Sequence, residues 1–183
     1  MDPIGCSARD ARRAGRRRPA KRFDADLNDY ERRVRAGPCF ICELVDGSPA
    51  YRHRIVYQDA ECVAFMDKYP TLAGKVLVAP KRHIEHVVGD LPLDDFLRLM
   101  TTVYRVASAV ASAVPTERIY LLSLGSQQGN RHIHWHVAPL PPGLPYDQQQ
   151  FHALMMEHGV LALSPEDQEA VARRIEALMP EHE

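Results

Sequence analysis

The pattern of apolar and polar positions divides the chain into short strands and a few helices. Runs of β-branched and aromatic residues, each bounded by turn residues, predict five strands, at 54–58, 62–67, 75–80, 118–124 and 132–140. Between the third and fourth strands, residues 93–114 carry apolar side chains at three- and four-residue spacing. This spacing predicts an amphipathic helix of about six turns whose apolar side covers one face of the sheet; its apolar positions are Phe96, Met100, Val103, Tyr104, Ala107, Val110, Ala111 and Val114.

Two further helices are predicted at the flanks of this pattern. Residues 24–36 begin with acidic side chains and end with arginine before Gly37-Pro38, which suits the helix dipole and a stop signal. Residues 165–179 follow Ser164 as a cap, with Pro165 at the first helical position. Strands with one long helix between them indicate an α+β fold, in which about five strands form an antiparallel or mixed sheet and the long helix covers one face.

Charge separates the first residues from the rest of the chain. The formal net charge is −1, yet residues 1–22 hold eight Arg and Lys against Asp2 and Asp10, so this segment carries +6. It has almost no bulky apolar side chains and cannot offset its chain entropy by burial, so we expect a disordered basic tail. The expected role is a solvated extension, and contact with nucleic acid or another polyanion is the alternative.

Composition excludes several classes of protein for a chain of 183 residues. With 45% hydrophobic and 26% charged residues the chain can bury a core, and no run approaches the ~18 apolar residues of a membrane span. No apolar segment follows the basic opening, so we expect neither a secretory signal nor a membrane partner, and a cytoplasmic location. Four cysteines do not suggest a disulfide scaffold, and Cys39-x-x-Cys42 has the spacing of a zinc half-site, a redox pair or two buried thiols.

The strongest chemical signal is a row of three histidines, His132, His134 and His136, which alternate with apolar residues. On a strand, this period of two places all three imidazoles on one face, with about 7 Å between successive positions. Strand propensity does not explain such a row, because aligned imidazoles repel each other when protonated. Two functions would explain it: metal binding, or phosphate chemistry in which a neutral imidazole is the nucleophile.

These residues resemble the histidine triad (HIT) superfamily of nucleotide hydrolases and transferases. Its signature is three histidines with one apolar residue between each pair, followed by two apolar residues. Residues 132–138 match this signature in full. The resemblance covers about residues 38–142 and includes the Cys-x-x-Cys opening, FMDKYP, GKVLVAPKRHIEHV and the long helix. It implies an α+β sheet with a long helix, and a homodimer.

The resemblance also implies a role for each matching residue. His134 is the nucleophile that attacks the α-phosphorus of a nucleotide, and its ring is held by a backbone carbonyl near His132. His136 lies beside the phosphate and the leaving group, and Gln128 matches a glutamine that holds phosphate oxygens or the leaving-group bridge. Asp67 matches an acid that binds ribose hydroxyls, although an aspartate that closes the turn before Pro70 is the alternative.

Three features depart from the family pattern. Lys75 stands where many members have histidine, and this permanent cation could neutralise phosphate charge. Gly129 stands where a small hydroxyl residue is usual, and Ser126, Gln127 or Asn130 could replace that contact. The segment PLPPGLPYDQQQF follows the family core, so substrate specificity cannot be carried over from relatives.

The resemblance gives the cysteine pair a structural role. In a subset of bacterial relatives this pair binds zinc together with a histidine of the P-K-x-H segment and the first triad histidine. The matching residues form a closed four-ligand set: Cys39, Cys42, His83 and His132. His86 is the alternative ligand, and His53, His152, His158 and His182 are expected to be ordinary surface residues.

The sequence therefore predicts three parts: a basic tail at 1–22, a HIT-type catalytic domain at 23–142 and a helical extension at 143–183. The expected reaction proceeds through a covalent nucleotidyl-histidine and needs no metal for catalysis. Dinucleoside polyphosphates are the first choice of substrate and nucleoside phosphoramidates the second. Two rivals are a nucleotide-binding regulatory module with little turnover and a hydrolase that holds a catalytic metal on the histidine row.

Overall fold

A computed structural model describes residues 21–179 of the chain, and its centre is one antiparallel sheet. Five strands lie in the order β2-β3-β4-β6-β5, and every neighbouring pair is antiparallel. Their bounds are Ile55–Gln58 (β2), Cys62–Met66 (β3), Val76–Pro80 (β4), Arg118–Ser123 (β5) and Trp135–Leu140 (β6). The α+β class and the five strands predicted from the sequence are confirmed, and the sheet is antiparallel rather than mixed.

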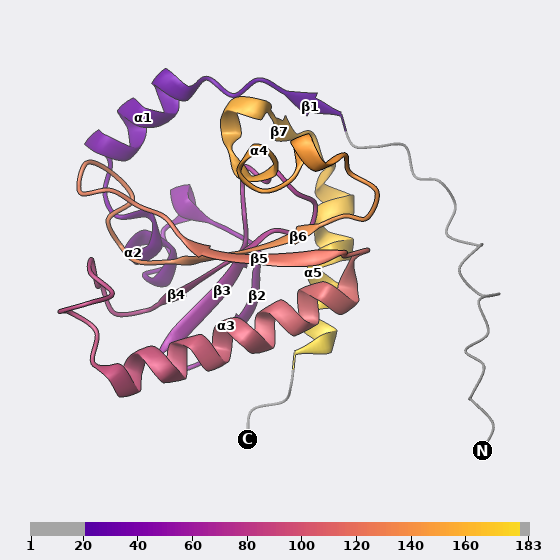
Figure 1. The fold of residues 1–183 in the computed structure, drawn as a ribbon. Coiled ribbons are helices and arrows are strands. Elements are labelled where there is room, and N and C mark those ends of the chain that lie inside the picture. The colour runs from indigo at the N-terminus through magenta and orange to yellow at the C-terminus, as the bar shows by residue number, and fades with distance from the viewer. Residues whose placement is uncertain (1–20, 180–183) are drawn as a thin grey trace, which may run out of the picture.

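Helices cover both faces of this sheet (Figure 1). On one face lie α3, Leu93–Ala113, and α5, Pro165–Leu178, which share a hydrophobic core with the central strands. The short helix α2, Phe40–Val45, covers the other face through Ile41 and Leu44. Because both faces are covered, every residue of β3 and β4 is buried. The second face also carries the histidine row.

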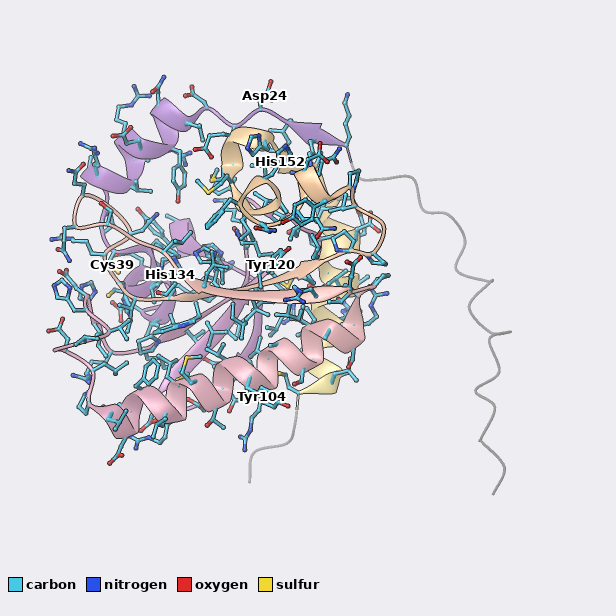
Figure 2. The ribbon with its side chains drawn as sticks, in the orientation of Figure 1. Asp24, Cys39, Tyr104, Tyr120, His134 and His152 are labelled. Atoms are coloured by element: carbon cyan, nitrogen blue, oxygen red, sulfur yellow. The ribbon has the colours of Figure 1, made fainter. Side chains whose placement is uncertain are left out.

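The predicted helix boundaries match the structure closely. The first helix, α1, spans Leu27–Ala36, and the Asp26 carboxylate caps it by accepting the Asp29 backbone N–H. Ser164 caps α5 as predicted, by accepting the Asp167 N–H. The predicted inner face of α3 is partly wrong, because Tyr104 is 70% exposed and Ala111 is also exposed. Val103, Ala107 and Val110 are buried as predicted, Leu99 and Val106 complete the buried stripe, and Tyr104 lies on the solvent side (Figure 2).

Smaller elements join the two ends of the described chain. Strand β1, Arg22–Phe23, pairs with β7, Val160–Leu161, and the Arg22 guanidinium donates to the carbonyls of Gly159 and Thr71. Three short 3-10 helices and one helical turn complete the fold: η1 (Pro49–Tyr51), η2 (Tyr146–Gln148), α4 (Phe151–Leu154) and η3 (Met156–His158). Residues 21 and 22, assigned to the tail from the sequence, therefore belong to this structure; residues 1–20 of the tail lie outside the described range. Within residues 21–179, no helix is both long and apolar enough to cross a bilayer.

Strand β6 begins three residues later than the sequence pattern predicts. Its ladder with β4 ends at the pair Val78–Trp135, and two residues further the same register would place Pro80 opposite Ile133. Proline has no N–H to donate to a ladder. The Ile133 N–H donates instead to the Ile84 carbonyl, in the loop after β4. His132 and His134 therefore lie on an extended segment that leads into the strand, and only His136 lies within it.

Candidate active site

The histidine row keeps the alternation of faces that the sequence predicts, although its first part is not a strand. Ile133, Trp135 and Val137 point into the core shared with α3. His132 and His134 are 1% and 4% exposed, so they are nearly as buried as the core itself. The row is thus an internal polar layer rather than the decoration of a surface strand.

A backbone hydrogen bond fixes the His134 ring. Its Nδ1 lies 2.8 Å from the His132 carbonyl oxygen, so Nδ1 carries the proton and donates it. The neutral ring then has its lone pair on Nε2, as a nucleophile requires. Burial lowers the pKa of His134 and outweighs the opposite effect of this hydrogen bond, which favours the neutral ring. The rings of Phe40 and His136 flank it, with centroids 5.8 Å and 4.9 Å away.

A buried ion pair lies beside these imidazoles. Each of its charges would lose much of its hydration free energy if it were buried alone. Lys75 Nζ is 3.0 Å from Asp67 Oδ2, and the two side chains are only 7% and 12% exposed. Asp67 Oδ1 also accepts the Tyr69 N–H at 2.9 Å. Burial alone would raise the pKa of Asp67, but the Lys75 ammonium and the Tyr69 N–H outweigh it, and the net pKa is lowered. Asp67 is therefore ionised at neutral pH.

His136 adds an unpaired polar atom to this site. Its Nδ1 is buried, and no group of the described residues forms a hydrogen bond with it. Burial, followed by the charge of Lys75, lowers the pKa of His136 to about 3, so its ring is neutral. A buried polar nitrogen without a partner costs about 1–3 kcal/mol. This cost would be recovered if a ligand supplied the missing partner.

Four other side chains form a cluster of metal-ligand type at one end of the row. The ligand atoms of Cys39, Cys42, His83 and His132 all lie within 4.8 Å of one another. Three of the separations are 3.2, 3.4 and 3.7 Å, each between a sulfur and an Nδ1. Ligands that bind zinc tetrahedrally at about 2.0–2.3 Å lie roughly 3.3–3.8 Å apart. The donor set and its spacing thus fit zinc.

The second nitrogen of each histidine in this cluster also has a partner. His132 Nε2 lies 2.9 Å from the Pro80 carbonyl, and His83 Nε2 lies 3.2 Å from a Glu85 carboxylate oxygen. Such partners hold a ligating imidazole in place with Nδ1 available for a metal. His86 does not belong to the cluster. Its Nε2 lies 3.5 Å from Nε2 of Gln127 instead. The choice of His83 over His86 is thus supported by geometry.

The other expected phosphate ligands lie on the loop that precedes the row. Among the described residues, Gln128 forms no hydrogen bond with the histidines; its side chain accepts from Arg35 of α1, and its N–H donates to Ser126. Asn130 donates from Nδ2 to the Tyr30 hydroxyl, 2.9 Å away. The structure therefore gathers His134, His136, Asp67 and Lys75, and it connects Gln128 and Asn130 to α1.

His53 is a site residue that sequence reasoning missed. It was expected on the surface, but its ring is half-buried and packs 5.0 Å from Phe65 and 6.1 Å from Phe40. Its Nδ1 lies 3.3 Å from the Met66 carbonyl. Since Phe40 also lies against His134, the rings of Phe40, His53 and Phe65 form an aromatic wall beside that histidine. His53 stands in no motif, so no sequence signal pointed to it. His152 and His158 are exposed as expected and stack on each other, and His182 lies outside the described residues.

Comparisons with known proteins agree with this geometry. A family model described as the HIT domain matches residues 49–142. An uncharacterized HIT-like protein of Saccharolobus solfataricus is 33% identical over 104 residues, which are 55% of this chain and 73% of that protein. An adenosine 5'-monophosphoramidase of Schizosaccharomyces pombe is 28% identical over 109 residues, 56% of this chain and 74% of that protein.

Solved structures show the same fold. A hypothetical histidine triad nucleotide-binding protein of Sulfolobus tokodaii aligns with a TM-score of 0.62 at 24% identity, over 77% of this chain and 91% of that one. A zinc-bound histidine triad family protein of Mycobacterium smegmatis aligns with a TM-score of 0.60 at 23% identity, over 77% and 92%. Figure 2 shows Cys39 and His134 close together on the sheet face away from α3. Because the family model spans half the chain and includes the whole histidine row, this protein belongs to the HIT family.

Proposed function

We propose that this protein transfers or hydrolyses nucleotides at the α-phosphorus through a covalent intermediate on His134. In the first step the Nε2 lone pair forms a bond to phosphorus. The bond from phosphorus to the leaving group breaks, and that group keeps the electron pair and takes a proton from water. In the second step water, or another acceptor hydroxyl, forms a new bond to phosphorus while the N–P bond breaks. The acceptor's proton is released to solvent and His134 is regenerated.

The observation that carries this proposal is the hydrogen bond between His134 Nδ1 and the His132 carbonyl. It keeps the proton on one ring nitrogen and leaves the other free, in a buried ring that burial holds neutral. A histidine that served only as a structural donor would gain nothing from a buried, unpaired neighbour such as His136 Nδ1. In our interpretation, His136 Nδ1 forms its hydrogen bond with a phosphate oxygen or the leaving group when substrate is bound.

The charge of Lys75 supports phosphate as the bound group. Its ammonium group is paired with Asp67 and raises the positive potential around His136. Negative charge that develops on the phosphoryl oxygens would be stabilised there, in a site that excludes most water. Asp67 accepts from Lys75 and Tyr69, and its carboxylate has lone pairs left for a ribose hydroxyl. We place the base against the aromatic wall of Phe40 and His53.

Two substrate classes fit this site. Dinucleoside polyphosphates would use the cation of Lys75 for their additional phosphate charge. Nucleoside phosphoramidates are favoured by the resemblance to the Schizosaccharomyces pombe protein, which is named as an adenosine 5'-monophosphoramidase. A panel of both classes, with products separated by chromatography, distinguishes them. Release of a nucleoside monophosphate from either class supports the proposal, whereas tight nucleotide binding without turnover of any substrate would support a regulatory module instead.

We propose that the cluster of Cys39, Cys42, His83 and His132 binds a structural zinc ion. A similar fold with zinc bound, the Mycobacterium smegmatis protein, supports this assignment. With four protein ligands the coordination shell is closed, so such an ion has no open position for substrate. His134 and His136 do not belong to the cluster. This division of the row favours covalent chemistry over a catalytic metal held by all three histidines. It also gives His132 two tasks, since its side chain faces the cluster while its carbonyl orients His134.

We propose a homodimer formed along β5 and α3. Strand β5 is the last strand of the sheet, so one side of its backbone has no neighbouring strand among the described residues. Next to this edge, Leu121 of β5 is 45% exposed, and Leu97 and Tyr104 of α3 are 54% and 70% exposed. An edge strand with apolar side chains beside it is a surface that a second copy can cover.

A further inference from the structure

Helix α1 lies outside the residues that match the HIT family model, yet it contacts the loop that leads into the histidine row. Three consecutive loop residues each meet α1: Gln128, Gly129 and Asn130. Figure 1 shows the loop between β5 and β6 beside this helix. Since these residues precede His132 directly, α1 can influence how the loop presents its side chains to a phosphate chain.

The contact at Gly129 brings the loop close to Val34 of α1. A Cβ atom at this position would lie 3.0 Å from Cγ2 of Val34 and 3.5 Å from the Val34 carbonyl carbon. The closest atom belongs to the Val34 side chain, and the helix backbone lies at ordinary van der Waals distance. A side chain at position 129 would therefore crowd Val34 of α1, which would have to shift by a few tenths of an ångström.

The contact at Gln128 sets the direction of its amide group. Arg35 donates from Nη2 to Gln128 Oε1. A guanidinium has five N–H donors and no acceptor, so it binds the carbonyl end of an amide and never the NH2 end. The Gln128 NH2 group then keeps two donors for other partners. The Glu31 carboxylate lies 2.6 Å from the same Nη2 and holds the Arg35 side chain in this position.

A second contact holds the end of the loop. Asn130 has a left-handed backbone, with φ of 56°, which is uncommon for a residue other than glycine. Its Nδ2 donates to the Tyr30 hydroxyl at 2.9 Å, and the Tyr30 ring packs edge-on against Tyr69 at 6.1 Å. Tyr69 in turn donates its N–H to Asp67. The loop is thus held by α1 at Gln128 and Asn130, and the second contact is connected to Asp67 through Tyr30 and Tyr69.

We propose that Arg35 is a positioning residue for substrate binding, because it orients Gln128 so that the amide presents N–H donors, and not its carbonyl, to the phosphates. This inference rests on the proposed function, in which Gln128 faces phosphate oxygens. An anionic oxygen accepts hydrogen bonds and is repelled by a carbonyl. Arg35 therefore acts through Gln128, and α1 supplies a part of the site that the matched domain alone lacks.

A double-mutant cycle on Arg35 and Gln128 tests this coupling. The readouts are the Kd of AMP, measured by calorimetry, and kcat/KM for whichever substrate the panel identifies. We expect Arg35→Ala to weaken AMP binding about ten-fold, the scale of one hydrogen bond to a charged group. Arg35→Lys should recover part of this loss, because lysine is also a donor without acceptors. In the Gln128→Ala background, Arg35→Ala should change the Kd by less than about two-fold, because Arg35 acts through the Gln128 side chain that is no longer there. If the two residues acted independently, their effects on the Kd would add.

Arg32→Ala is the matched control, since Arg32 lies on the same helix, is 73% exposed and pairs with Asp29. It should leave AMP binding unchanged. Arg35 is 51% exposed, so its replacement should not prevent folding, which thermal unfolding checks. Equal effects of Arg35→Ala in the wild-type and Gln128→Ala backgrounds would overturn this inference alone. If AMP binds and the cycle shows coupling, but no covalent adduct forms on His134, the proposed chemistry fails and this inference stands. If AMP does not bind at all, both are wrong.

Discussion

Replacing Lys75 by methionine should destabilise the protein strongly, because it leaves Asp67 as a buried charge without its cation. The two side chains are 7% and 12% exposed and their charged atoms are 3.0 Å apart. Removing one partner of a buried ion pair typically costs about 3–5 kcal/mol. Since the Tyr69 N–H remains with Asp67, we expect the lower end, about 3 kcal/mol of unfolding free energy. For a chain of this size that corresponds to a fall in Tm of roughly 6–12 °C.

Urea unfolding at neutral pH of Lys75→Met, Asp67→Asn and the double variant measures this coupling. Each single variant should lose about 3 kcal/mol, and the double variant should lose far less than their sum. We expect a coupling free energy of at least about 2 kcal/mol. If the two losses simply add, the pair is not an interacting unit, and the assignment of Lys75 as a buried cation beside the phosphate site is wrong.

The same pair predicts how stability depends on pH. The pKa of Asp67 is lower in the folded protein than in an unfolded chain, so folding favours its ionised form. The pair's contribution is therefore complete above the unfolded value, about pH 4, and is lost as the pH falls through the lowered pKa. The coupling free energy should thus be the same at pH 7 and pH 5. A clear decrease between these values would contradict the direction of the shift.

Three shorter predictions follow from the other features. Purified protein should contain about one zinc ion per chain, and Cys42→Ser should lower both the zinc content and the Tm. The control variant His86→Ala should leave both unchanged. Metal-free protein of unchanged stability would disprove the zinc site. Tyr104→Glu should shift a dimer to monomer in sedimentation experiments, whereas the equally drastic Leu178→Glu, on the helix beside the opposite edge strand, should not. Deleting residues 1–20 should keep turnover of a small nucleotide within about two-fold, because all the site residues lie beyond them, and a large loss would mean that the tail contributes to the site.

Local patterns predicted most of the fold. The five strands are runs of β-branched and aromatic residues, α1 was predicted from its acidic start and its arginine end before Gly37-Pro38, and the cap of α5 was predicted at Ser164. The predicted alternation of side-chain direction along residues 132–138 is also confirmed, since Ile133 and Trp135 pack in the core while the histidines face the opposite side. These features succeed because each depends on residues close together in the chain. The predicted start of β6 was wrong for the opposite reason. Its true start depends on Pro80, which is more than fifty residues earlier in the chain.

The site was predictable where a motif named it and not elsewhere. The four metal-type ligands were found from the family resemblance, and the structure brings them together. His53 stands in no motif, and its burial depends on where Phe40 and Phe65 come to lie. The contact between Arg35 and Gln128 joins residues 93 positions apart, from a helix with no buried residue of its own. The charge pattern and the stop signal predict that such a helix exists, but they do not show what the helix contacts.

The central claim, that His134 forms a covalent bond to phosphorus, is tested most directly by trapping the intermediate. Turnover of a radiolabelled nucleotide is quenched within the first cycle, and peptides are analysed under conditions that preserve phosphohistidine. We expect a nucleoside monophosphate on the peptide containing residues 132–136, absent in His134→Asn, whose turnover falls by at least ~10³-fold while nucleotide affinity stays within about ten-fold. Rapid turnover by His134→Asn, with no adduct on the wild-type peptide, would contradict the account.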